Sequence, residues 1–213
     1  MSSVAIVDYG MGNLHSIAKA LQYADPLVHV TVSADAERIL AADRVVFPGV
    51  GAIRECMAAL QSNGLVEVVR TAAQNKPFLG ICLGMQALLS ESEENGTVAG
   101  LDILPGRVVR FADNLVDKHG EHLKIPHMGW NQVHYAAHPL WQQIPQDSRF
   151  YFVHSYYAKP DNSAITIATT EYPETFACAL AHNNVFAVQF HPEKSQAAGL
   201  QLLRNFLHWD GLV

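Results

Sequence analysis

The sequence is poor in cysteine, in basic residues and in long apolar runs, and each shortage removes a class of protein. Three cysteines in 213 residues, without regular spacing, form neither a disulfide framework nor a zinc pattern, so we expect a reducing, cytoplasmic setting. Only 14 lysines and arginines stand against 20 acidic residues, which leaves no basic stripe for nucleic acid. No apolar stretch approaches the roughly 20 residues that span a bilayer, so no membrane partner is expected.

What the chain does have is an alternation of strand-like apolar runs with helical patterns, which predicts a parallel sheet covered by helices. Its length and 49% hydrophobic composition allow a substantial core, and we expect one α/β domain over residues 1–213. The predicted strands of the first half are Val4–Val7, His29–Val32, Val45–Phe47 and Phe78–Ile81. The predicted helices are Leu14–Tyr23, Asp35–Leu40 behind a Ser33 cap, Ile53–Gln61, Leu65–Gln74 and an amphipathic helix from Leu83 to about Ser90.

In the second half, short β runs lie between Pro, Asn and Asp turns, so the sheet is expected to gain antiparallel strands. Phe176–Ala181 and Val185–Phe190 are typical of a hairpin, because the asparagines between them tolerate the positive φ of tight turns. A final helix is predicted over Ala197–Trp209. The other predicted strands are Val108–Phe111, Phe150–Val153 and Ile165–Thr170.

The segment Gly80–Gly84 places Cys82 between two glycines, each two residues away, where a strand is expected to turn sharply into a helix. This is the pattern of a nucleophile elbow, in which a Cβ at either glycine would collide. Cys82 would stand at the amino end of the helix, which favours its thiolate, and the Leu83 amide would face a developing oxyanion. A free cysteine is more often a small buried hydrophobe, and we assign that role to Cys56 and Cys178, which lack the turn.

A nucleophilic cysteine needs a base, and the segment Phe186–Glu193 offers one. A strand there delivers His191 at its carboxyl end, and Pro192 stops further pairing. Because residues two apart in an extended segment face the same way, Glu193 can hold the other imidazole nitrogen. The sequence therefore predicts a catalytic triad in the order cysteine, histidine, glutamate.

Together with Pro48–Gly51, the segments Gly80–Gln86 and Gln189–Glu193 closely resemble the motifs of the triad-type, or class I, glutamine amidotransferases. More narrowly, Asp8–Leu14 and Pro126–Asn131 resemble the glutaminase subunits of imidazole glycerol phosphate synthases. The resemblance covers essentially the whole chain. It implies a flavodoxin-like, doubly wound, mostly parallel sheet with additional antiparallel strands and a site at the carboxyl ends of the strands.

The resemblance also implies a reaction. Cys82 attacks the carboxamide of L-glutamine, ammonia leaves, and water cleaves the γ-glutamyl thioester, with His191 moving the protons. The ammonia passes to a cyclase or synthase subunit, bound as a heterodimer, which makes imidazole glycerol phosphate and AICAR in histidine biosynthesis. No cofactor or metal is implied.

Further site residues follow from the resemblance. The oxyanion hole is expected from Val50, Gly51 and Leu83. Because the β-branched Val50 disfavours positive φ, it stays open whether the hole is ready-made, and we expect poor hydrolysis by the chain without its partner. L-Glutamine is expected to contact Gly49, Gln86, Glu94, His154, Ser155 and Tyr156. The partner is expected to contact loop residues of a kind that suits an interface, namely Met11, Asn13, Met128 and Trp130.

Alternatives remain open on sequence grounds. A metal site is disfavoured, because no cysteine or carboxylate pair completes a shell around the central histidines, which are His119, His122, His127, His134 and His138. A γ-glutamyl peptidase on the same fold has no use for Met11–Asn13 and His127–Asn131. A non-catalytic binding module would not need the triad. A glutaminase subunit from vitamin B6 or aminobenzoate synthesis is separated only by the two narrower segments.

Overall fold

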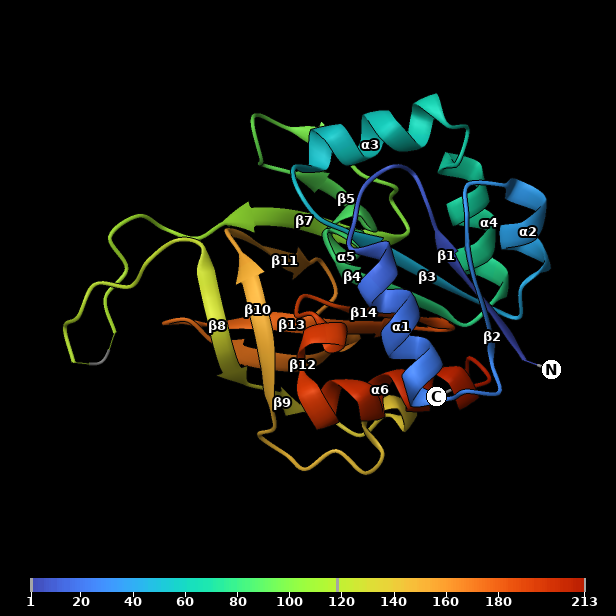
Figure 1. Cartoon of the computed structure of the whole chain (residues 1–213). Coiled ribbons are helices and arrows are strands. Elements are labelled where there is room, and N and C mark those ends of the chain that lie inside the picture. Colours follow the sequence, from blue (N-terminus) through green and yellow to red (C-terminus); the bar gives the residue numbers. More distant parts are fainter. Residues whose placement is uncertain (1, 118, 213) are drawn as a thin grey trace.

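The computed structural model describes residues 2–117 and 119–212 and shows a large central sheet with helices on both faces (Figure 1). Along one part of this sheet, five neighbouring strands pair in parallel. In spatial order these are β2 (His29–Ser33), β1 (Ser3–Val7), β3 (Arg44–Gly49), β4 (Phe78–Cys82) and β14 (Val185–Val188). Their carboxyl ends therefore meet at one edge, where the ends of β3, β4 and β14 lie side by side.

Beyond β14 the pairing changes, because β13 runs antiparallel to β14 across a tight hairpin turn. Asn183 in that turn has a φ of 51°, as expected of an asparagine in a tight hairpin. The sheet continues through β13 (Thr175–His182), β11 (Tyr156–Pro160), β7 (Leu104–Arg110), β5 (Leu89–Ser92) and β6 (Val98–Ala99). Two more strands pair off this path, β12 (Thr166–Glu171) and β9 (His134–Tyr135).

A separate two-stranded ribbon is formed by β8 (His127–Gln132) and β10 (Arg149–His154). The ribbon is antiparallel, and its register places His154 directly opposite His127. β10 leads through Ser155 into β11, so the ribbon is joined directly to the main sheet. In Figure 1 it stands at the side of the molecule remote from β2.

Helices divide the core into two layers, one on each face of the sheet. The longer helices are α1 (Leu14–Ala24), α3 (Ile53–Ser62), α4 (Val66–Asn75) and α6 (Gln196–His208). Shorter ones are α2 (Ala36–Ala41), α5 (Leu83–Ala87) and 3₁₀ turns at Pro139–Trp141, Ser163–Ile165 and Pro192–Lys194. α1 and α6 cover one face together with the ribbon, while α2, α3 and α4 cover the other.

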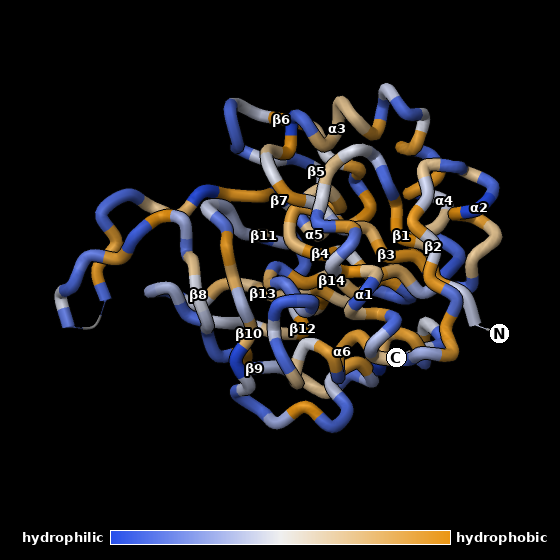
Figure 2. The backbone as a smooth tube through the Cα atoms, viewed as in Figure 1, coloured by the Kyte–Doolittle hydropathy of each residue, from blue (hydrophilic) through white to orange (hydrophobic). Residues whose placement is uncertain are grey.

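The parallel strands are buried because their sequences are apolar on both faces. All five residues of β4 and four of the five residues of β1 are buried. Such continuous apolar runs are expected of parallel strands that are covered on both sides. Figure 2 shows these hydrophobic segments in the middle of the molecule and hydrophilic segments at its periphery.

Two local predictions are wrong. The helix expected to run from Leu83 to about Ser90 ends at Ala87, and all of its residues are buried rather than only one face. The chain then enters β5, which pairs with β7, so strand pairing overrides helix propensity. The cap of α2 is Asp35, whose carboxylate accepts from the Arg38 amide at 3.0 Å, while Ser33 accepts from the Asp35 amide.

None of the described helices combines the length and the apolar character needed to cross a bilayer.

Candidate active site

Cys82 lies at a sharp turn of the chain, and the turn requires an unusual backbone conformation at Cys82 itself. β4 ends at Cys82 and α5 begins at Leu83, so the strand becomes a helix within one residue. The φ of Cys82 is 55° and its ψ is −113°, a combination that side-chain-bearing residues rarely adopt. Strain concentrated at one residue between strand and helix is the geometry of a nucleophile elbow.

The two elbow glycines are required by the neighbouring strands. A Cβ on Gly84 would lie 2.0 Å from the Phe47 carbonyl oxygen on β3. A Cβ on Gly80 would lie 3.2 Å from the Ala187 Cβ on β14 and 3.3 Å from the Met85 Cα. The closest approach of a Gly80 Cβ would be 3.1 Å, to Cδ1 of Leu88. Gly84 is therefore required by β3, whereas Gly80 is required both by β14 and by the chain that follows the turn.

His191 reaches the same edge of the sheet as Cys82 because it follows β14, the parallel neighbour of β4. Its Nδ1 lies 2.9 Å from Oε1 of Glu193, and the two side chains are only 3% and 1% exposed. The contact arises from a 3₁₀ turn over Pro192–Lys194 rather than from the extended backbone that the prediction assumed. The turn brings the carboxylate back against the imidazole.

The pKa values of the buried groups differ between the site and the rest of the core. Burial opposes a charge on His191, but the proximity of Cys82 and the hydrogen bond to Glu193 outweigh it and raise the pKa of His191 to about 10. Burial raises the pKa of the Cys56 thiol to about 11 and also raises that of Cys178. Cys82 is therefore the described cysteine that lies beside an imidazole of raised pKa.

Cys82 and His191 line one cavity of about 320 Å³, a size suited to a small molecule. Of the other predicted site residues, this cavity collects Val50, Gly51, Leu83, Gln86, Glu94, His154, Ser155 and Tyr156. Gly49 is buried behind the wall, where a Cβ would lie 2.9 Å from the Leu83 Cβ. The structure thus gathers residues from distant parts of the chain around the thiol.

The segment Pro48–Gly51 lies directly beside the elbow, and its last two residues, Val50 and Gly51, line the cavity. Val50 is 39% exposed, and the positive φ of 92° falls on Gly51 rather than on Val50. The segment is anchored from below, because the buried Tyr9 hydroxyl donates to the Pro48 carbonyl at 3.0 Å. The Pro48 end of the segment is thus held by a buried hydrogen bond, whereas Val50 is partly exposed to solvent.

Gln86 on α5 connects the elbow to the opposite wall. Its Nε2 donates to the Tyr156 carbonyl and to Oε1 of Gln189, both at 2.9 Å. Nε2 of Gln189 in turn lies 3.8 Å from Sγ of Cys82. Both amide hydrogens of Gln86 are thus used within the protein, so its carbonyl oxygen is the group left for a cationic ligand.

Two further predicted contacts have protein partners of their own. One carboxylate oxygen of Glu94 accepts from the Ile53 amide at 2.8 Å and so caps α3 while lining the cavity. His154 is buried, and its two ring nitrogens contact Nδ1 of His127 and the Tyr156 carbonyl oxygen. Both ring nitrogens of His154 therefore have partners within the protein, and the predicted contact of this residue with glutamine stays a prediction.

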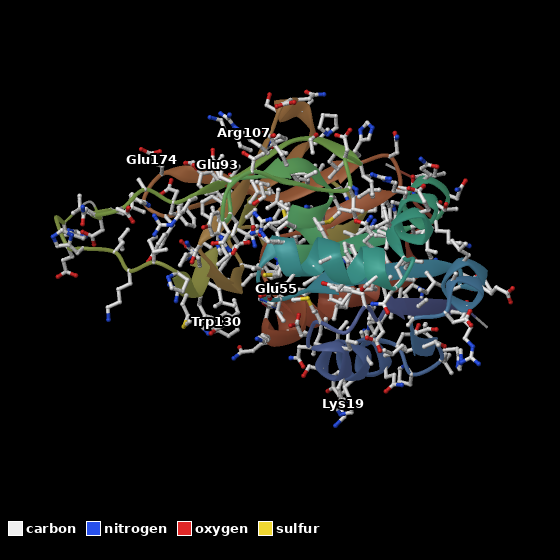
Figure 3. The ribbon with its side chains drawn as sticks, turned by 90° about the horizontal axis from the view of Figure 1, so that it is seen from above. Lys19, Glu55, Glu93, Arg107, Trp130 and Glu174 are labelled. Carbon is white, nitrogen blue, oxygen red and sulfur yellow. The ribbon has the colours of Figure 1, made fainter. Side chains whose placement is uncertain are left out.

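The four predicted interface residues divide into two pairs. Met128 is 61% exposed and Trp130 is 43% exposed, and Figure 3 shows Trp130 at the periphery. Met11 and Asn13 are half-buried. A Cβ built on Gly51 would lie 3.0 Å from Cε of Met11, so this side chain packs against the segment Pro48–Gly51.

Within residues 2–117 and 119–212, no group of three or more His, Cys, Asp or Glu side chains is arranged to hold a metal ion.

The family model described as glutamine amidotransferase class-I matches residues 5–209. The chain belongs to this family. It is 65% identical to the imidazole glycerol phosphate synthase subunit HisH of Methylococcus capsulatus, covering 99% of this chain and 98% of the relative. It is 59% identical to the subunit of the same name from Nitrosococcus oceani over the full length of both. The solved structure of PurLQS from Thermotoga maritima superposes with a TM-score of 0.72 at 14% identity, covering 97% of this chain and 98% of that one, which supports the fold.

Sequence reasoning about this amidotransferase missed three side chains that support the site. Tyr9 anchors Pro48, Gln189 links Gln86 to Cys82, and His127 contacts His154. Each lies within a segment that carried the resemblance, which was the available signal. Their roles depend on contacts between distant segments, which spacing along the chain does not reveal.

Proposed function

We propose that this chain is the glutamine-hydrolysing subunit of an imidazole glycerol phosphate synthase and supplies ammonia to a cyclase subunit bound as a heterodimer. The observation that carries the proposal is one cavity in which the strained Cys82 meets His191, itself bound to Glu193. The whole-chain identity to subunits of that name supports the particular partner. The three free, buried cysteines support a reducing cytoplasmic location.

The mechanism begins with a proton already on the imidazole. Because the pKa of His191 is raised to about 10, the ring is charged at neutral pH and can stabilise a negative charge on the neighbouring Cys82 sulfur. The sulfur attacks the carboxamide carbon of L-glutamine, and the C–N bond breaks as His191 donates its proton to the leaving nitrogen. Ammonia and a γ-glutamyl thioester on Cys82 result.

The second half of the reaction uses the same imidazole in the opposite direction. Formation of the thioester removes the negative charge beside His191, so its pKa falls and the neutral ring can take a proton from water. Hydroxide attacks the thioester carbonyl, and glutamate leaves as the thiolate returns. Glu193 orients the ring and stabilises its charged form throughout.

The cavity walls assign the remaining roles. The Leu83 amide and one from Val50 or Gly51 stabilise the oxyanion. The carbonyl oxygen of Gln86 and the carboxylate of Glu94 suit the α-ammonium of glutamine. Backbone groups of Ser155 and Tyr156 bind its carboxylate end, while Gly49 leaves room beside the elbow.

The central experiment is Cys82→Ala in the complex with the synthase subunit. Glutamine-dependent synthesis should be abolished, whereas synthesis from added ammonia should remain nearly intact, because the thiol only produces ammonia. Cys178→Ala removes another buried thiol, which lies outside the cavity, and is the matched control. Equal loss of both activities in Cys82→Ala would assign the thiol a structural role.

Two companion assays sharpen the assignment. Glu193→Ala should retain more activity than Cys82→Ala, because an orienting group can be lost while nucleophile and base remain. Free glutamine should be a better substrate of the complex than a γ-glutamyl peptide, and the opposite preference would favour a peptidase.

The free chain should hydrolyse glutamine poorly and become active when the partner binds. The exposed Val50 beside a glycine of positive φ gives a segment whose position a partner can bias. Hydrolysis should be measured for the free chain, for the complex and for the complex with the synthase's ligand. Equal rates in all three would reject this part of the proposal.

A further inference from the structure

Two buried histidines face each other across the ribbon formed by β8 and β10. His127 and His154 are register partners, and Nδ1 of the first lies 3.0 Å from Nε2 of the second. The ring of His127 is stacked between Phe152 and Tyr172, with centroid distances of 4.9 and 4.0 Å. The reaction outlined above uses neither imidazole directly, although one of them borders the cavity.

One end of the pair reaches the cavity wall. Nδ1 of His154 lies 2.8 Å from the Tyr156 carbonyl oxygen, which also accepts from Nε2 of Gln86. Tyr156 and Gln86 both line the cavity, and Gln86 lies on the helix that follows Cys82. The position of His154 therefore helps to set the distance between the cavity wall formed by Ser155 and Tyr156 and the wall formed by Gln86 and the elbow.

The other end of the pair reaches Asn131 on β8. Oδ1 of Asn131 accepts from the Gln132 amide at 2.9 Å, and its Nδ2 donates to the Glu171 carbonyl at 2.8 Å. These two backbone partners fix the orientation of the side-chain amide. The group 3.3 Å from Nε2 of His127 is therefore the amide nitrogen, which can only donate.

The chain of contacts has a single hydrogen-bond direction. A carbonyl oxygen only accepts, so Nδ1 of His154 must carry a hydrogen. Burial lowers the pKa of His154 to about 3 and that of His127 to about 4, so each ring carries one hydrogen at neutral pH. Nε2 of His154 must then accept from Nδ1 of His127, and Nε2 of His127 from Asn131. Every polar atom of the two rings is satisfied in this arrangement alone.

We propose that His127 and His154 are positioning residues that hold the Ser155–Tyr156 wall of the glutamine pocket and connect it to the inner face of β8. The outer face of the same strand carries the exposed Met128 and Trp130, because side chains alternate along a strand. A synthase subunit seated on that outer face would therefore also hold the pocket wall in place. The positioning role rests on the proposed glutaminase function, whereas the hydrogen-bond direction does not.

The hydrogen-bond direction is tested by NMR of the full chain labelled with ¹⁵N in its histidines. At neutral pH, the rings of His127 and His154 should each carry their hydrogen on Nδ1, and each of these two signals should disappear in its own variant, His127→Leu or His154→Leu. Either of these two rings found protonated on both nitrogens, or on Nε2 alone, would overturn the arrangement. This measurement needs neither glutamine nor the partner.

The positioning role is tested by glutamine hydrolysis in the complex with the synthase subunit. His154→Leu removes the donor to Tyr156 and should raise KM for glutamine about tenfold. His154→Asn can donate from nearly the same place and should keep KM within about threefold of the wild type. A rescue by asparagine separates a positional role from a general loss of packing.

A third variant guards against misfolding, because Asn131 is only half-buried. Asn131→Asp keeps the shape but faces two acceptors with a carboxylate, so KM should rise about threefold or more. Asn183→Asp makes the same change in the remote hairpin turn and should leave KM unaltered. Unchanged KM in both His154→Leu and Asn131→Asp, in an active complex, would overturn the positioning role. A wild-type complex without glutaminase activity would instead reject the function on which the role rests.

Discussion

The parallel and antiparallel parts of this amidotransferase hold their functional groups by different means. In the parallel part, backbone geometry places the nucleophile, since Gly84 lies against the Phe47 carbonyl and Cys82 itself adopts a positive φ. In the antiparallel part, side-chain hydrogen bonds between His127, His154 and the Tyr156 carbonyl hold the opposite wall. The contrast shows that one wall is fixed by steric exclusion and the other by polar contacts that can be adjusted.

β14 joins the two parts, because it pairs in parallel with β4 and antiparallel with β13. His191 follows this strand, so the proposed base lies at the boundary between the sterically fixed Cys82 and the hydrogen-bonded wall. A change on either side should therefore affect catalysis, but by different routes. Loss of folding is expected on the parallel side, and altered binding or coupling on the antiparallel side.

The largest effect should come from Gly84→Ala, which tests steric fixation in the parallel part. Its Cβ would lie 2.0 Å from a backbone oxygen of β3, so the elbow must shift. We expect a loss of at least about 3 kcal/mol in the free energy of unfolding, measured by urea denaturation. Gly80→Ala, whose closest contact would be 3.1 Å, should cost less. Equal stability of Gly84→Ala and the wild type would contradict steric fixation.

Acid should weaken the antiparallel part next. Burial lowers the pKa values of His127, His138 and His154 to about 4, 4 and 3, below the ordinary value of 6.5. The unfolded chain therefore binds more protons between these limits, and stability should be full above pH 6.5 and fall toward pH 4. The raised pKa of His191 acts oppositely, but its contribution is complete below pH 6.5 and is lost only toward pH 10.

Urea denaturation at about pH 7, 6 and 5 checks this dependence. His154→Leu should flatten it, whereas the exposed His29→Gln should leave it unchanged. A dependence that is identical in both variants would show that the buried histidines of the antiparallel part do not control acid stability.

Tyr9→Phe tests the segment Pro48–Gly51, which lies in the parallel part and is held by the Tyr9 hydroxyl. The change removes the hydroxyl that donates to Pro48 and keeps the ring against Phe47, whose centroid is 5.6 Å away. We expect a three- to tenfold lower kcat of the partner-bound enzyme, about 1 kcal/mol, because the oxyanion segment loses an anchor. Tyr23→Phe, at a residue that is 73% exposed, is the control. An unaltered kcat would show that the anchor is dispensable.

The smallest effect should come from Trp130→Ala on the outer face of β8. The side chain is 43% exposed, so the free chain should keep its unfolding temperature. Binding to the synthase subunit should weaken about fivefold in Kd, or about 1 kcal/mol, as isothermal titration can show. Leu27→Ala, at a residue that is 80% exposed and lies between α1 and β2, should not change Kd. The same Kd in both variants would place the partner elsewhere.

Most of the first half of the fold was predictable, since the strands β1 to β4 and helices α1, α3 and α4 begin and end close to the expected residues. The exception is α5, where Leu89 and Ser90 continue a helical pattern but lie in strand β5. Its residues are buried on all sides, so amphipathic periodicity carried no information there. The contact of His191 with Glu193 was expected, although a 3₁₀ turn produces it.

Features with local causes could be derived from the order of residues alone: the apolar strands, the longer helices of the first half, the glycine-flanked cysteine and the short spacing from His191 to Glu193. Which distant groups meet depends instead on how the whole chain packs. It placed Tyr9 beneath Pro48, Gln189 between Gln86 and Cys82, and His127 opposite His154. The physical reason is that hydrogen bonds between buried groups depend on strand order and register, and these are set by the packing of the whole sheet.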